Sequence, residues 1–300
     1  MEEKGEKFEP LETLYMGGGT PSLLKPDKLE QLLRKLEDYN IRLSGDYEFT
    51  IEVDPGTFNQ AELEQWTKIG VNRFSVGVQA YNQSDLEILD RRHQLNDINE
   101  CLNLLQAKNL NFSVDLLIGT PFSESRDLEN ELNGLLKFGP SHFSVYILNA
   151  RANYPHKKNL PEDEISRDQY LLVSNFLTQK GFEHYEVSNF AKTKELESSH
   201  NKRYWDFKSV AAVGPNATGT ICSPEEVFRY QWKSLSDGFQ VETVAGSSLL
   251  IEKLFLSLRR SEPVDLSSLL DSSKLSKNLD SKLENWHQLG YVLPDSKINN

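Results

Sequence analysis

The sequence predicts an α/β protein built on a parallel sheet, because strand-like runs alternate with helix-like segments along its first half. Between residue 12 and about residue 147, short runs of β-branched or aromatic residues recur five times. The longer segments between them carry apolar residues at helical spacing, which is the pattern of repeated βα units. With 300 residues, of which 38% are hydrophobic, the chain is long enough for one large α/β barrel or two smaller domains.

The elements of this first half follow one another in a regular order. Strands are expected over residues 12–16, 47–53, 72–78, 111–117 and 142–148. Helices are expected over residues 26–40, 61–69 and 124–138, and the third crossover combines a short turn near residue 86 with a helix near 98–105. Pro26 suits the first turn of the first helix, Gly70 stops the second, and Gly139-Pro140 closes the last.

The pattern changes after about residue 150. A helix near 166–180, a strand over 182–188 and helices at 247–260 and 274–288 are expected there, separated by irregular segments. We therefore predict two domains, residues 1–150 with the parallel sheet and residues 151–300 as an α+β accessory region.

Composition and charge argue against several classes of function. The net charge of −12, without a clustered basic face, argues against binding to nucleic acid. Cys101 and Cys222 are too few for a disulfide framework or a four-ligand metal site, and we expect both to be small buried residues. The chain begins without an apolar leader and its apolar stretches are broken by charges, so neither export nor membrane insertion is expected. We expect a cytoplasmic protein.

A run of three glycines, Gly17 to Gly19, closes the first strand and is followed by Thr20 and Pro21. Glycines let the backbone approach a ligand closely and present its N–H groups to it. The run is not followed by Gly-Lys-Ser/Thr, so it is not a nucleotide-binding P-loop. A tight turn between strand and helix is the alternative interpretation.

Four further strings follow at or after the ends of strands. They are Ile51-Glu52-Val53-Asp54-Pro55-Gly56-Thr57, Gly77-Val78-Gln79, Arg91-Arg92-His93 and Asp115-Leu116-Leu117-Ile118-Gly119-Thr120-Pro121. With the glycine run, their order and spacing resemble the oxygen-independent coproporphyrinogen oxidase group of radical S-adenosylmethionine (SAM) proteins, and its HemW-type heme chaperones in particular. The resemblance implies a partial parallel (β/α)6 barrel in which the five strands above are strands two to six. The first strand is then expected to precede Met1.

The resemblance also implies a site for SAM. Its residues in this chain would be Gly18, Gly19, Thr20, Glu52, Gln79, Arg91 and Asp115. Carboxylates and hydroxyls suit the ammonium group and ribose hydroxyls of SAM, and Arg91 suits its carboxylate. The alternatives are a solvated strand end for Glu52, a turn hydrogen bond for Gln79, and a surface ion pair of Arg91 with Asp85 or Asp90.

A second string, His200-Asn201-Lys202-Arg203-Tyr204-Trp205, also resembles HemW-type chaperones. In that group the string is associated with heme binding, so the resemblance implies His200, Tyr204 and Trp205 as heme-binding residues. An imidazole with two nearby aromatic rings suits iron ligation and stacking on a porphyrin. Alternatively, this segment is a capped loop whose aromatic side chains enter the accessory core. The chain departs from the family at Thr218, where a histidine is usual.

One family feature is absent from this chain. The three cysteines, spaced C-x3-C-x2-C, that bind the family's [4Fe-4S] cluster do not occur in it. We therefore expect no cluster, no catalytic residue, no metal ligand and no SAM cleavage by this chain alone. The resemblance implies binding of heme and its transfer to an unknown acceptor protein. The alternatives are an oxygen-independent coproporphyrinogen III dehydrogenase and a non-catalytic module that binds SAM or heme.

Overall fold

The computed structural model describes residues 9–234, 236–262, 264 and 284–289. The chain forms two compact units, residues 1–200 and residues 201–300. A seven-stranded sheet lies in the first unit and a three-stranded sheet in the second.

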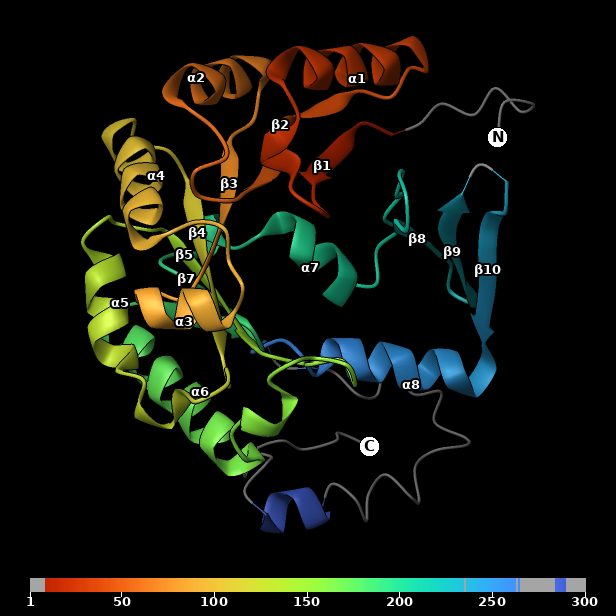
Figure 1. The fold of residues 1–300 in the computed structure, drawn as a ribbon. Coiled ribbons are helices and arrows are strands. Elements are labelled where there is room, and N and C mark those ends of the chain that lie inside the picture. The colour runs from red at the N-terminus through yellow and green to blue at the C-terminus, as the bar shows by residue number, and fades with distance from the viewer. Residues whose placement is uncertain (1–8, 235, 263, 265–283, 290–300) are drawn as a thin grey trace. The chain divides into compact units, whose positions relative to one another are not determined.

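The large sheet has the strand order β1-β2-β3-β4-β5-β7-β6 and is curled (Figure 1). Its strands are β1 (Leu11–Met16), β2 (Leu43–Val53), β3 (Arg73–Gln79), β4 (Phe112–Ile118), β5 (His142–Ile147), β6 (Glu183–Glu186) and β7 (Asn189–Ala191). β1 to β5 pair in parallel, and β7 pairs antiparallel with both β5 and β6. The prediction of a partial parallel barrel with five strands in chain order is confirmed.

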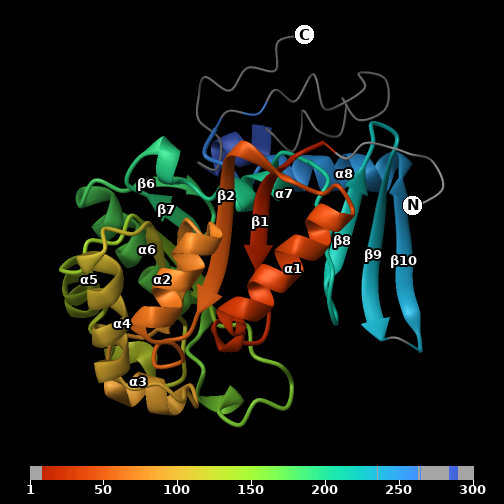
Figure 2. The same cartoon turned by 90° about the horizontal axis from the view of Figure 1, so that it is seen from above.

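Helices connect the parallel strands and cover the outer face of the sheet (Figures 1 and 2). They are α1 (Pro26–Asp38), α2 (Gln60–Ile69), α3 (Gln83–Ile88), α4 (Leu95–Ala107), α5 (Leu128–Leu136) and α6 (Asp163–Gln179). As predicted, Pro26 begins α1 and Gly70, with φ +113°, ends α2.

The outer face of the sheet is apolar and forms the core with these helices. Phe49, Ile51, Phe74 and Val114 alternate with polar residues along their strands, and each is 0% exposed. Helix residues of the same core are Leu29, Trp66, Leu102 and Leu132. Burial of these side chains against the sheet holds the βα units together.

The inner face of the same strands is polar. Its residues alternate with those of the core, and they are Thr50, Glu52, Arg73, Ser75, Ser113, Asp115, His142 and Ser144. The interior of a closed parallel barrel is usually filled by branched apolar side chains. The polar inner face of this sheet differs from such an apolar interior, and Thr50, Ser113 and His142 on it are completely buried.

The strand expected over residues 182–188 is shorter in the structure and is the first half of a hairpin. β6 ends at Glu186, the chain turns at Val187 and Ser188, and β7 returns to pair with β5. The first compact unit therefore extends to His200. The division into domains 1–150 and 151–300 stays a prediction.

The second unit contains an antiparallel sheet with the order β10-β9-β8. Its elements are β8 (Thr218–Cys222), β9 (Glu226–Ser234), β10 (Gly238–Ala245) and the helix α8 (Gly246–Ser257). α8 confirms the helix expected at 247–260, whereas β9 and β10 lie where irregular segments were expected. Of the helix expected over 274–288, residues 284–288 are helical and the rest lies outside the described residues.

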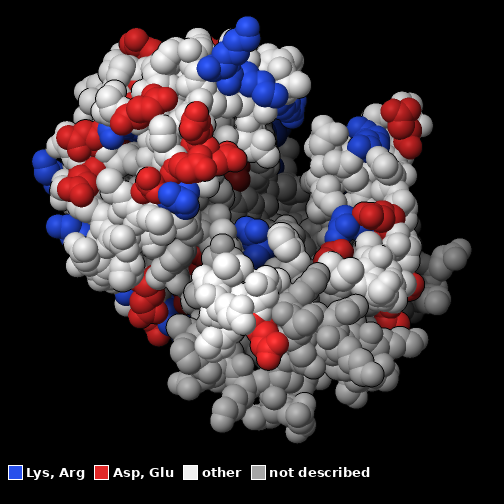
Figure 3. All heavy atoms as spheres, turned by 90° about the horizontal axis from the view of Figure 1, so that it is seen from below, with Lys and Arg blue, Asp and Glu red and all other residues white. Residues whose placement is uncertain are grey.

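Acidic side chains are spread widely over the face of the molecule drawn in Figure 3. Basic side chains are scattered among them, in agreement with the net charge of −12. Within the described ranges, no helix is long and apolar enough to cross a membrane.

Candidate functional site

The loop after β1 is formed by Gly17, Gly18 and Gly19. Gly18 and Gly19 have φ values of +82° and +63°, which favour glycine, and a Cβ added to either would meet nothing within 4 Å. At Gly17 a Cβ would lie 2.7 Å from Tyr15 Cε1 and 2.9 Å from Glu52 Oε1. The loop therefore packs against Tyr15 and Glu52 on one side and is open at Gly18 and Gly19.

Glu52 connects the end of β2 to this loop. Its Oε2 accepts a hydrogen bond of 3.0 Å from the Gly18 backbone N–H, and its Oε1 accepts one of 2.8 Å from the Tyr15 hydroxyl. Burial and the nearby carboxylates of Glu52 and Asp115 raise the pKa of Tyr15 well above its usual value. Tyr15 consequently stays protonated and acts as a donor, and Glu52 is more than a solvated strand end.

Thr20 and Gln79 come together around Asp54 and Gly77. The Thr20 hydroxyl donates to Asp54 Oδ2 over 3.3 Å. A Cβ on Gly77 would lie 2.9 Å from Asp54 Oδ1 and 3.0 Å from Gln79 Nε2, so Gly77 leaves room for both side chains. Gln79 has φ +66°, an uncommon backbone conformation for a residue other than glycine. Such conformations cluster at functional sites.

Asp115 lies on the polar inner face of β4. Its Oδ2 accepts a hydrogen bond of 2.8 Å from the Ser75 hydroxyl. Burial raises its pKa to about 6, and hydrogen bonds from Ser75 and Ser144 oppose that shift. The Glu52 carboxylate raises it further, and the guanidinium of Arg73 lowers it. Two carboxylates in one polar interior favour a cationic ligand.

Arg91 follows α3 in the chain. Within the described part of the chain, no hydrogen bond or ion pair joins its side chain to Gly18, Glu52 or Asp115. Burial lowers the pKa of His93, and the guanidinium of Arg91 lowers it further. Among the described residues Arg91 forms no ion pair with Asp85 or Asp90, the alternative interpretation, and Asp85 lies 3.7 Å from Arg126 Nε.

His200 contacts the first two strands of the large sheet. Its ring stacks on that of Tyr15, with centroids 4.8 Å apart and planes inclined by 20°. The His200 Nδ1 atom lies 3.0 Å from Thr13 Oγ1, and its backbone N–H donates to Glu48 Oε1 over 3.0 Å. Glu48 Oε2 accepts a second hydrogen bond, of 2.9 Å, from the backbone N–H of Ser199. Strands β1 and β2 thus fix the position of the imidazole.

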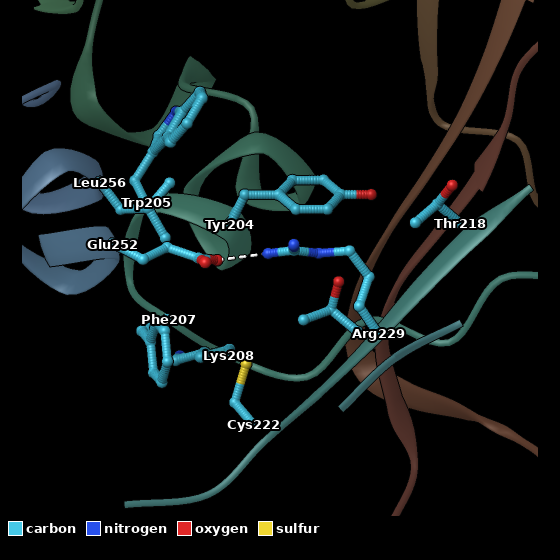
Figure 4. Close-up of a pocket in the computed structure, with 10 residues that line it drawn as sticks. Tyr204, Trp205, Phe207, Lys208, Thr218, Cys222, Arg229, Glu252 and Leu256 are labelled. Carbon is cyan, nitrogen blue, oxygen red and sulfur yellow. Dashed lines mark hydrogen bonds and ion pairs between the residues drawn. The ribbon is translucent and has the colours of Figure 1, made fainter. Parts of the chain in front are cut away.

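Tyr204 and Trp205 end the helix α7 (Ser199–Trp205) and belong to the second unit. They line a cavity of about 370 Å³, whose other walls are Phe207, Lys208, Thr218, Thr220, Cys222, Arg229, Glu252 and Leu256 (Figure 4). Arg229 forms an ion pair with Glu252, drawn as a dashed line in Figure 4. Because His200 and Tyr204 are four residues apart in one helix, they share a helix face.

The cysteines do not form a metal site. Cys101 is buried in α4, where burial raises the pKa of its thiol to about 12, and Cys222 is half-buried in β8. In the ranges that the structure describes, no group of three or more His, Cys, Asp or Glu side chains could hold a metal ion. The donors of this chain therefore do not fit an iron-sulfur cluster.

Several residues of the site had no signal in the sequence. Tyr15, Asp54 and Glu48 are not among the site residues that the resemblance implies, although Asp54 lies inside one of its strings. The contact between Thr13 and His200 joins residues 187 positions apart. No local pattern predicts such a contact.

The family model that matches this chain is that of the radical SAM superfamily, over residues 1–133. A protein of Synechocystis sp. named heme chaperone HemW is 35% identical over 269 residues, which are 84% of this chain and 65% of that protein. A heme chaperone HemW of Buchnera aphidicola is 32% identical over 72% of this chain and 57% of that protein. The chain thus spans less than two thirds of the length of these relatives.

A solved structure with the same fold is that of the coproporphyrinogen III oxidase HemN of Escherichia coli. It aligns with a TM-score of 0.76 and 20% identity, over 94% of this chain and 71% of that chain. At this identity the likeness concerns the fold. It agrees with the curled parallel sheet.

Proposed function

We propose that this chain, whose residues 1–133 match the radical SAM superfamily model and which is similar to proteins named heme chaperone HemW, is a HemW-like heme chaperone. It binds SAM at the carboxyl ends of the parallel strands, binds heme through the helix α7, and passes heme to an acceptor protein in the cytoplasm. The observation that carries the proposal is the placement of His200. Its imidazole stacks on Tyr15, whose hydroxyl holds Glu52 beside the glycine loop.

The SAM part of the proposal rests on the chemistry of the polar interior. SAM carries a sulfonium and an ammonium group, and the carboxylates of Glu52 and Asp115 suit both cations. The open backbone at Gly18 and Gly19 suits the amino-carboxylate end of the molecule. Gly18, Gly19, Thr20, Glu52, Gln79 and Asp115 stay our predicted SAM contacts. Arg91 is retained from the family resemblance alone.

The superfamily's radical chemistry requires a [4Fe-4S] cluster that reduces bound SAM. This chain has two cysteines, in β8 and α4, where the cluster needs three thiolates. The proposal therefore concerns the binding of SAM and heme by these residues and includes no step of SAM cleavage.

The heme part of the proposal rests on α7 and its surroundings. His200 supplies an imidazole as an iron ligand, and Tyr204, on the same helix face, supplies a ring for contact with the porphyrin. Trp205 stacks with Arg259, whose guanidinium carbon lies 4.5 Å from the ring centroid.

A comparison of two ring ligands tests the proposal against the rival function, an oxygen-independent coproporphyrinogen III dehydrogenase. Heme and metal-free coproporphyrin III are titrated into the chain separately, and SAM is titrated by calorimetry. The proposal expects one saturable heme site per chain and weaker binding of coproporphyrin III, because the metal-free ring offers no iron to the imidazole. Coproporphyrin III binding as tightly as heme contradicts it. If heme binds and SAM does not, the chain is a heme-binding module and the SAM part of the proposal is wrong.

A further inference from the structure

Tyr15 touches both candidate ligand sites. One face of its ring stacks on His200, at 4.8 Å between centroids, and its hydroxyl donates to Glu52 Oε1 over 2.8 Å. Glu52 in turn accepts a hydrogen bond from the backbone N–H of Gly18 through Oε2, over 3.0 Å. Three contacts therefore connect the His200 imidazole to the glycine loop, and all four residues belong to the first compact unit.

The glycine loop also packs directly on the Tyr15 ring. A Cβ at Gly17 would lie 2.7 Å from Tyr15 Cε1, closer than side-chain carbons pack, so the loop backbone has no spare room at this edge. On the other side, Thr13 Oγ1 holds the Nδ1 atom of His200 at 3.0 Å. The ring of Tyr15 therefore lies between the loop backbone and the imidazole of His200.

Both oxygens of the Glu52 carboxylate are used within this set of contacts. Oε1 accepts from Tyr15 and Oε2 accepts from Gly18. Each carboxylate oxygen can accept a second hydrogen bond, so a ligand on the glycine loop that offers an ammonium or hydroxyl group to Glu52 shares an oxygen with Tyr15 or Gly18. A ligand donor that shares Oε1 weakens the hydrogen bond from the Tyr15 hydroxyl, whose ring stacks on His200.

We propose that Tyr15 is a positioning residue that couples occupancy of the glycine loop to the orientation of the His200 imidazole. The inference rests on the function proposed above and deepens it: SAM on the loop weakens heme binding at His200, and heme weakens SAM binding by the same factor. SAM binding then acts as a signal for heme release.

Heme titrations with and without saturating SAM test the coupling. In the unchanged chain, SAM is expected to lower heme affinity at least about fivefold. Tyr15→Phe keeps an aromatic ring against His200 and removes the hydrogen bond to Glu52, so the ratio of the two affinities is expected to fall to near one. Tyr39→Phe is the matched control, because Tyr39 is 59% exposed at the end of α1, and it should keep the ratio of the unchanged chain. The proposal is overturned if the ratio of heme affinities without and with SAM is the same in Tyr15→Phe as in the unchanged chain. It is also overturned if SAM has no effect on heme binding in the unchanged chain.

A second measurement needs neither ligand and separates this proposal from the proposed function. The ring resonances of His200 are followed by NMR in protein with labelled histidine, and they are assigned by their loss in His200→Ala. Glu52→Gln is expected to shift them when Tyr15 is present and to leave them unmoved in the Tyr15→Phe background. If neither SAM nor heme binds, the proposed function fails. An equal shift in both backgrounds, or none in either, overturns the coupling itself.

Discussion

The guanidinium of Arg126 forms two hydrogen bonds with the carboxylate of Glu131, at 2.6 and 2.8 Å, and both side chains are almost completely buried. Arg126 also donates to the Leu117 carbonyl oxygen at 2.6 Å, which ties the ion pair to the end of β4. Glu131 accepts a further hydrogen bond of 2.6 Å from the backbone N–H of Tyr81. The pair thus joins α5 to the carboxyl ends of β3 and β4, close to the residues that form the candidate SAM site.

Removal of one partner of this ion pair is expected to be strongly destabilising. Arg126→Met leaves the Glu131 carboxylate buried without its cation, so the free energy of unfolding should fall by about 3–5 kcal/mol. Urea denaturation measures the change. Arg34→Met is the control, because the Arg34–Glu30 pair is exposed at 70% and 51%, and its loss should change stability by less than about 1 kcal/mol. Equal effects of the two substitutions contradict the assignment of a buried, hydrogen-bonded pair.

SAM binding is expected to weaken in mild acid because of Asp115. Burial raises the pKa of this carboxyl group to about 6, so it takes up a proton as the pH falls through that value. A cation bound nearby then loses a charge partner, and affinity should fall about tenfold between pH 7.5 and pH 5. Calorimetric titration at several pH values measures this. Asp115→Asn should bind SAM weakly at pH 7.5 and lose most of the pH dependence; an unchanged profile in that variant contradicts the role of Asp115.

Ionisation of the Asp115 carboxyl group should lower the stability of the folded protein as the pH rises, whereas it should strengthen SAM binding. Because its folded pKa, about 6, lies above the usual value of 3.8, the folded protein holds this proton more tightly than the unfolded chain. Its contribution to stability therefore decreases as the pH rises from about 4 to 6. Asp115→Asn is expected to raise the free energy of unfolding by about 1–2 kcal/mol at pH 7.5. That gain should shrink toward zero near pH 4, and a gain independent of pH would show that charge burial is not its cause.

A methyl group at Gly77 should displace two neighbouring side chains and so disturb the candidate SAM site. Its Cβ would lie 2.9 Å from Asp54 Oδ1 and 3.0 Å from Gln79 Nε2, so both side chains must move. Gly77→Ala is expected to lower SAM affinity about tenfold and stability by about 1–3 kcal/mol. Gly45→Ala is the matched control, since a Cβ there meets nothing within 4 Å. SAM affinity unchanged in Gly77→Ala would remove Gln79 from the site.

The parallel sheet could be predicted from the sequence because each strand carries a local signal. β-branched and aromatic runs mark β1 to β5, and helical spacing marks the crossovers between them. The hairpin of β6 and β7 was not predicted, because its turn at Val187 and Ser188 contains none of the glycine or asparagine that marks a tight turn. The strands of the second unit are mostly half-buried or exposed, without regular alternation, so they lack the two-residue period that marks a strand.

The resemblance implies Glu52 and Asp115 as site residues, but no sequence pattern predicts the contacts between site residues. Glu52 lies near the carboxyl end of β2, whereas Asp115 lies in the middle of β4. The hydrogen bond from Tyr15 to Glu52 and the stacking of Tyr15 on His200 depend on the curl of the sheet and on a return of the chain after β7. Contacts between residues so far apart in sequence arise from tertiary packing and leave no local pattern.

The most direct test of the account is the titration of heme into His200→Ala, followed at the Soret band. His156→Ala is the control, because His156 lies in a different loop and contacts Phe122 and Tyr154. The account predicts that His200→Ala shifts the Soret maximum and lowers heme affinity at least about tenfold, while His156→Ala matches the unchanged chain. An identical Soret position and affinity in His200→Ala and the unchanged chain would contradict the claim that this helix binds heme.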